Sequence, residues 1–347
     1  MRLERRAHTP VILAFLAPLA AVAVALVLAA GLIAAAGVNP ITAYGEMLRG
    51  ALGSRLSITE MLTRATPLIF TGLAAAVAFR ARLWNIGGEG QFFVGALATA
   101  WIGHSLAVPG FIGIPVLMLA GMAAGALLLA GPAYLRLRFG VDEVVTTLLL
   151  NFIIILLVGL MIEGPLRDPL AFGWPQSVPV DSSFRLPDLV PRTRLHIGLL
   201  FAVAAAGIVW LVFARTVFGA ETRAAGLNAT ASSFAGVSLP RTIMGVALLS
   251  GALAGLAGSV EVMGVTAGVT TTMSPGFGYA GIVVAMLAAL HPAGVVAGAV
   301  FVATVFVGAD AMSRATGVPS FIADVIVALC LLTMIVALLF TTHQVRR

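Results

Sequence analysis

The sequence predicts an all-α, polytopic membrane protein with about ten transmembrane helices and with both termini in the cytoplasm. Of the 347 residues, 60% are hydrophobic and 10% are charged, and the mean hydropathy is +1.08. A soluble domain carries about 25% charged residues. The apolar residues gather in blocks of about 20, the length that crosses a bilayer as a helix. They do not alternate with polar residues as the strands of a membrane barrel would.

Apolar runs predict ten crossings within a single membrane domain, residues 1–347. The runs cover residues 11–37, 62–80, 89–108, 112–134, 143–162, 196–214, 241–263, 278–293, 294–312 and 320–340. The first run follows a cluster of arginines, as in a signal peptide. Because it is roughly twice the length of a signal h-region, we expect an uncleaved span.

The arginine distribution favours cytoplasmic termini. With the termini inside, twelve of the 20 arginines lie inside and eight lie outside. Four of those eight belong to the proline-rich segment 163–195, which we expect to form an extracytoplasmic loop, and long loops are translocated with little regard to charge. The outer segment 40–58 predicts a short helix that lies in the membrane interface. Its apolar face consists of Ile41, Tyr44, Leu48, Leu52 and Leu56.

The composition excludes several chemistries. The chain has no lysine, so it lacks the lysine of a Walker A loop and of a Schiff base. The single cysteine, Cys330, excludes an intrachain disulfide and a cysteine metal cluster, and the five histidines are scattered. We therefore predict no catalytic residue, no metal site and no cofactor bound by this chain. Arginines retained on cytoplasmic loops explain the net charge of +6, so we predict no nucleic-acid partner.

The longest inner loop, residues 214–241, reads ARTVFGAETRAAGLNATASSFAGVSLPR. Asn228 is placed to cap a short helix over residues 229–235, because its side chain accepts a hydrogen bond from a free backbone N–H. Such a helix presents small side chains, on which the groove of another protein can close. The sequence therefore predicts a docking surface on this loop.

This loop resembles the coupling loop of ABC-importer permeases, and more narrowly that of the branched-chain amino acid, ribose and nucleoside permease family. The matching residues are Arg223, Ala225, Gly226, Asn228, Ala231, Ala235 and Gly236. Ser232 and Ser233 depart from the family's pattern. Other segments match in the right order: WNIGGEGQFFVGA, FGVDEVVTTLLLNFI, LSGALAGLAGSVEVMG and GFGYAGIVVAMLAALHPAG. The first of these is most similar to the nucleoside-type branch.

The resemblance implies the membrane-spanning permease subunit of a bacterial ABC importer in the inner membrane. Besides the lipid bilayer, it implies a cytoplasmic ATPase that holds ATP and magnesium. It also implies a second permease subunit, either a paralogue or a second copy, and an extracytoplasmic solute-binding protein. The implied solute is a nucleoside, then a simple sugar such as ribose, then a branched-chain amino acid. The alternative is an ion-coupled secondary transporter that uses Glu89, Glu261 and Asp324, but it leaves the 214–241 loop without a purpose.

The stretch RARLWNIGGEGQFFVGA, residues 80–96, joins two predicted spans and allows two interpretations. Gly87, Gly88 and Gly90 weaken the helix at this point. In the first interpretation, Asn85 and Glu89 cap a tight cytoplasmic turn, with Arg80 or Arg82 as counter-ion. In the second, a broken helix lines the translocation pathway, since transporters place irregular backbone at their binding sites.

Other residues are candidates for the same pathway, and each also has a structural use. Gln91 follows the joint, and Glu261 is an acid within an apolar, glycine-rich span. Phe277 and Tyr279 are able to stack on a base or a sugar ring, or else to pack in the core. Asn151 is expected to form hydrogen bonds between helices.

Overall fold

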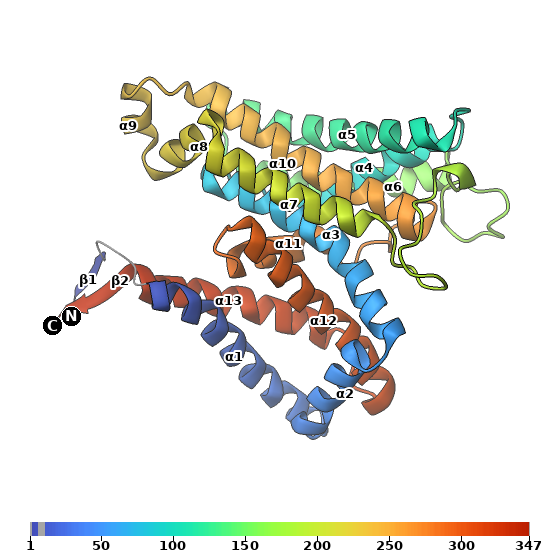
Figure 1. The fold of residues 1–347 in the computed structure, drawn as a ribbon, viewed down its shortest axis with the longest axis horizontal. Helices are drawn as coiled ribbons and strands as arrows, with labels where there is room; N and C mark the ends of the chain where they lie inside the picture. The colour runs from blue at the N-terminus through green and yellow to red at the C-terminus, as the bar shows by residue number, and fades with distance from the viewer. Residues whose placement is uncertain (1, 6–10, 347) are drawn as a thin grey trace.

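The computed structural model describes residues 2–5 and 11–346, and most of them are helical (Figure 1). Each of the ten predicted apolar runs contains a helix. These helices are α1 (Val11–Ala35), α3 (Arg55–Arg80), α4 (Gly88–Gly103), α5 (Gly110–Phe139), α6 (Glu143–Glu163), α7 (Gly198–Arg215), α10 (Leu239–Glu261), α11 (Phe277–Leu287), α12 (Pro292–Thr316) and α13 (Ile322–Thr342). The other elements of the described residues are α2 (Pro40–Leu52), α8 (Val217–Leu227), α9 (Ala229–Phe234), the 3-10 turn η1 (Ser182–Phe184), the π-helix η2 (Val262–Thr266), β1 (Arg2–Arg5) and β2 (His343–Arg346).

Two of the predicted crossings, α4 and α11, are too short to cross the membrane and are called half-helices below. Within the described residues, seven helices are long and apolar enough to cross a membrane, and α13 is a further apolar helix. In contrast, α4 has 16 residues and α11 has 11. At 1.5 Å per residue these helices are about 24 and 17 Å long, shorter than the hydrocarbon core of about 30 Å. The predicted runs 89–108 and 278–293 were too long because their apolar ends, 104–108 and 288–291, form turns.

Helix α3 lies at the centre of the bundle. It packs against α7 and α10 on one side and against α11 and α12 on the other. Figure 1 shows it crossing between an upper group of helices, α4 to α10, and a lower group that contains α1, α2, α12 and α13. Nearly every side chain from Thr63 to Phe79 is buried, as expected for a helix surrounded by other helices.

Small residues bring the helices of the upper group close together. A Cβ atom added to Gly95 would lie 2.2 Å from the carbonyl oxygen of Gly255, and one added to Gly125 would lie 2.2 Å from that of Gly251. The α4, α5 and α10 backbones therefore touch, which is the usual role of small residues between membrane helices. The small residues of the GALAGLAG run, 251–258, thus allow the close packing of α10.

The bundle has two distinct ends. Strands β1 and β2 pair antiparallel, with Arg2 opposite Arg346, so both termini lie at one end, the termini end, on the left of Figure 1. Helices α8 and α9 lie at this end too. The predicted loop 163–195 lies at the opposite end, the loop end, and contains η1 and one isolated β-bridge, between Arg167 and Ser177. A second bridge joins its Asp188 to His196. Two hydrogen bonds join its Ser177 to Val269, in the segment that leads to α11.

The predicted interfacial helix 40–58 differs from the observed one in length and orientation. It ends at Leu52, because α3 begins at Arg55. Its buried face consists of Ala43, Met47 and Ala51, which the sequence analysis did not select, whereas Ile41 is 82% exposed. The reason is close packing: a Cβ added to Gly50 would lie 2.0 Å from the Cβ of Ala311 in α12. Small residues thus face α12, and the larger apolar ones face outward.

Candidate functional site

The N-termini of the two half-helices meet at Glu89. This residue lies in the first turn of α4, and its Oε2 accepts a hydrogen bond of 2.6 Å from the backbone N–H of Gly278, in the first turn of α11. The side chain is only 3% exposed. Because the N-terminus of a helix carries partial positive charge, two such ends stabilise one carboxylate. Neither Arg80 nor Arg82 serves as its counter-ion: the ion pairs of the described residues do not include Glu89.

This half-helix junction lies inside the membrane-spanning part of the bundle. Thr71 of α3 donates a 2.9 Å hydrogen bond to the carbonyl oxygen of Phe277. Along α3, Thr71 is about 13 Å from the helix end at Arg80. Since the hydrocarbon core is about 30 Å thick, the junction places irregular backbone and a carboxylate well within it. Non-helical backbone is tolerated at that depth only where protein buries it or where it lines an aqueous cavity.

A pair of side-chain amides closes the turn between α3 and α4. Asn85 Nδ2 donates to Gln91 Oε1 at 2.9 Å, and Gln91 Nε2 donates back to Asn85 Oδ1 at 2.8 Å. Asn85 also donates to the Ser250 hydroxyl at 3.0 Å and accepts from the backbone of Gly87 at 3.0 Å. Both amides are buried. Their hydrogen bonds fix the shape of the turn.

Asn151 of α6 connects this turn to α11. Its Oδ1 accepts from the backbone of Gly90 at 2.8 Å, and its Nδ2 donates to the carbonyl oxygen of Ile86 at 2.9 Å and to the hydroxyl of Tyr279 at 3.1 Å. The predicted interhelical role of Asn151 is therefore confirmed. Tyr279 is 38% exposed, so its ring is reachable from outside the chain, whereas Phe277 is buried against Phe92.

The structure does not bring Glu261 and Asp324 to the junction. Glu261 ends α10, about 16 Å along that helix from Ser250. Asp324 is exposed in the first turn of α13. An ion pair that the sequence did not predict lies near the loop end, where an Arg64 nitrogen is 2.8 Å from an Asp310 oxygen. This ion pair could have been predicted because both charged residues lie within apolar helices, where a charged side chain is stable only when it is paired.

The expected docking helix is present at the termini end. Asn228 Oδ1 accepts a 3.0 Å hydrogen bond from the backbone of Ala231, so the predicted cap is confirmed, and α9 runs from Ala229 to Phe234. Sequence analysis did not anticipate α8, which precedes it. Of the residues that the sequence predicts to dock the partner, four have exposed side chains: Arg223, Asn228, Ala231 and Ala235.

Two glycines of this segment are constrained for different reasons. Gly236 has a φ of +88°, a conformation that a side chain would strain. Gly226, in contrast, lies within α8. Its constraint is close contact, since a Cβ at Gly226 would lie 1.9 Å from the carbonyl oxygen of Arg80. Helix α8 therefore rests on the end of α3, with the buried Ala225 beside it.

Arg80 extends this contact to α11. Its Nη2 and Nε donate to the carbonyl oxygen of Leu290 at 2.8 and 3.2 Å, and its guanidinium lies over the Phe213 ring, 4.8 Å from the centroid. Leu290 belongs to the tight turn after α11 and has a φ of +61°. A continuous set of contacts thus runs from α8 through Arg80 to α11, whose other end holds Glu89.

Comparison with known proteins places the chain in a family. Residues 57–342 match the family described as the branched-chain amino acid transport system permease component. The guanosine ABC transporter permease protein of Bacillus subtilis is 35% identical, over 91% of this chain and 92% of its own. The glucose ABC transporter permease protein of Haloferax volcanii is 34% identical, over 99% and 93%.

A further relative, the nucleoside ABC transporter permease protein of Lactococcus lactis, is 34% identical over 90% of this chain and 88% of its own. No solved structure matches the chain. Because the relatives include an archaeal protein, they support a multi-pass membrane protein without restricting it to bacteria. The chain belongs to the family of branched-chain amino acid transport system permease components, and it is a membrane permease of an ABC importer rather than an enzyme.

Proposed function

We propose that this permease imports a nucleoside, with a simple sugar as the second choice and a branched-chain amino acid as the third. The observation that carries the proposal is the partly exposed ring of Tyr279 beside the half-helix junction, because transporters place irregular backbone at their binding sites. The guanosine and nucleoside permeases among its relatives support a nucleoside as the solute, and the glucose permease supports a simple sugar as the second choice.

Within the junction, we assign contact with the solute to Tyr279. Its ring is partly exposed, and it is able to stack on a base or a sugar. Glu89, Asn85 and Gln91 hold the backbone behind it, because their polar atoms are already bonded to protein groups. Phe277 packs in the core, and Glu261 lies too far along α10 to join them.

The partners follow from the two ends of the bundle. The exposed surface of α8 and α9, residues 217–236, docks a cytoplasmic ATPase, which carries the ATP and magnesium. The loop end receives a solute-binding protein on the opposite side of the plasma membrane. A second permease subunit, a paralogue or another copy, completes the pathway. With the termini end of the bundle facing the cytoplasm, both termini are cytoplasmic, in agreement with the arginine distribution.

Uptake of labelled solutes tests the proposal. The permease is reconstituted in vesicles with its ATPase, its second permease and its binding protein, and ATP-driven uptake of guanosine, ribose and leucine is compared. We expect guanosine to be taken up fastest. Uptake of leucine alone would contradict the solute assignment. Uptake that continues with an inactive ATPase, and stops when the ion gradient is collapsed, would favour the secondary-transporter alternative.

A further inference from the structure

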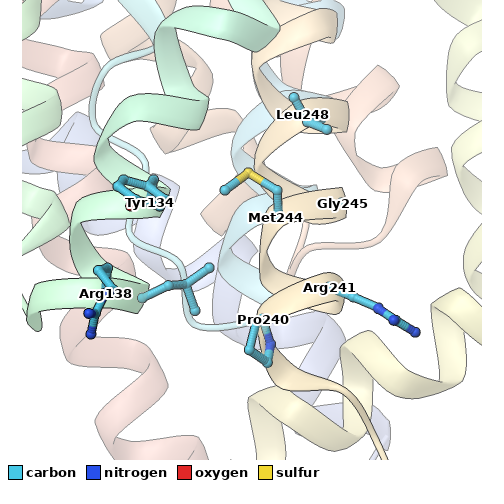
Figure 2. A pocket seen from close by; sticks show the side chains of 8 residues that line it. Tyr134, Arg138, Pro240, Arg241, Met244, Gly245 and Leu248 are labelled. Carbon is cyan, nitrogen blue, oxygen red and sulfur yellow. The ribbon is translucent and has the colours of Figure 1, made fainter.

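A groove opens on the outer surface between α5 and α10 at the termini end (Figure 2). Its volume is about 670 Å³. Its walls are largely apolar, and two arginines are among the lining residues. The lining residues are Tyr134, Leu137, Arg138, Pro240, Arg241, Met244, Gly245 and Leu248. The coupling contacts described above use none of these side chains.

The two kinds of side chain are separated along the groove. Figure 2 shows Arg138 and Arg241 at one end and Leu248 at the other, with Met244 between them. The charged end coincides with the end of α5 at Phe139 and the start of α10 at Leu239. From Leu239 to Leu248 the groove follows α10 for about 13 Å, close to the roughly 15 Å depth of hydrocarbon in one leaflet.

Neither arginine is neutralised by the protein. Among the ion pairs of the described residues, none involves Arg138 or Arg241. The Arg138 guanidinium lies over the ring of Phe139, 5.8 Å from its centroid, which leaves its N–H groups free for an anion. The first turn of α10, beside Arg241, has no side-chain cap, so its backbone N–H groups also face an anion favourably.

From this arrangement we infer that the groove binds an anionic phospholipid of the leaflet at the termini end. The phosphate lies at the end of the groove that Arg138 and Arg241 flank on opposite sides (Figure 2), since basic residues beside membrane helices attract anionic headgroups. One acyl chain lies along Met244 and Leu248. A soluble ATPase does not reach that depth of the bilayer, and the outer face of α5 continues as exposed apolar surface, with Leu127 70% exposed.

Native mass spectrometry of the full-length permease, purified with its partner subunits, tests this inference. The complex is titrated with phosphatidylglycerol, with phosphatidylcholine, and with glycerol phosphate, the headgroup without acyl chains. We expect phosphatidylglycerol to bind most tightly and glycerol phosphate to bind weakly. In the double variant Arg138→Gln, Arg241→Gln, the affinity for phosphatidylglycerol should fall about 30-fold, since each arginine near an anionic headgroup contributes roughly fivefold.

A second double variant is the matched control. Arg82→Gln with Arg215→Gln removes the same charge from exposed positions near the termini end, outside the groove, and should leave the affinity unchanged. Equal loss in both double variants would overturn the inference, because it would indicate attraction to the surface as a whole. Tight binding of glycerol phosphate would overturn the role of the apolar wall. Binding of phosphatidylglycerol only to permease from which the ATPase has been removed would assign the groove to the ATPase instead.

Discussion

Replacing Glu89 by glutamine keeps the size of the side chain and an oxygen that accepts from Gly278, and it removes the negative charge between the two half-helix N-termini. One such end stabilises a carboxylate by about 0.3–1 kcal/mol at a surface and by up to about 2 kcal/mol when partly buried. Because the burial of a charge offsets much of this stabilisation, we expect Glu89→Gln to lower the free energy of unfolding by about 1 kcal/mol or less. Glu89→Ala should cost about 1–3 kcal/mol more, because the Gly278 N–H loses its partner.

The assay compares denaturation of the purified protein in detergent with ATP-driven uptake per folded complex. If Glu89 holds the junction together, the Glu89→Gln protein loses stability and its uptake follows the amount of folded complex. The exposed Glu163, at the end of α6, provides the control, and Glu163→Gln should change neither quantity. Uptake that collapses while stability is unchanged would refute the capping role and would make Glu89 part of the pathway.

Three further predictions concern other parts of the molecule. Arg80→Gln removes the paired contact with Leu290, so ATP hydrolysis should continue while the uptake per ATP hydrolysed falls. Equal uptake per ATP in Arg80→Gln and in the control Arg82→Gln would contradict this. Tyr279→Phe keeps the ring and should retain solute affinity, whereas Tyr279→Ala should weaken it by about 1–3 kcal/mol if stacking holds the base, as measured by the solute concentration at half-maximal uptake. His196, just before α7, has its pKa lowered to about 4 by burial, so the folded protein binds its proton less readily than the unfolded chain. Stability should be complete above pH 6.5 and fall by about 3 kcal/mol towards pH 4, a loss that His196→Gln should abolish in pH-dependent melting.

Much of the architecture could be predicted from local patterns. Each long apolar run contains a helix, since the length and polarity of a segment decide whether it crosses a bilayer. The cap at Asn228 was predictable because it depends on neighbouring residues alone. Hydropathy could not separate helical residues from the apolar turns that follow α4 and α11. For this reason the two half-helices were predicted as full crossings.

The details of the site depend on distant contacts, which a single sequence does not reveal. The partner of Glu89 is Gly278, 189 residues away, so the nearby arginines were considered as counter-ions instead. The close contact of Gly226 with Arg80 likewise depends on where α8 packs. The buried face of α2 follows from the small residues opposite it in α12, and its own apolar periodicity indicated another face.

The central claim is that α8 and α9 form the surface through which an ATPase drives this permease. Ala231 is exposed on α9, and Ala231→Arg would place an unpaired charge in the interface, which should weaken docking by about 3 kcal/mol, over a hundredfold. The variant should fold normally, because the surface lies outside the helices that span the membrane. The measurement is co-purification of the ATPase together with ATP-driven uptake, with Ala231→Ser, which stays small and neutral at the same position, as the control. The account predicts that only Ala231→Arg loses both, and an Ala231→Arg permease that retains its ATPase and full uptake would contradict it.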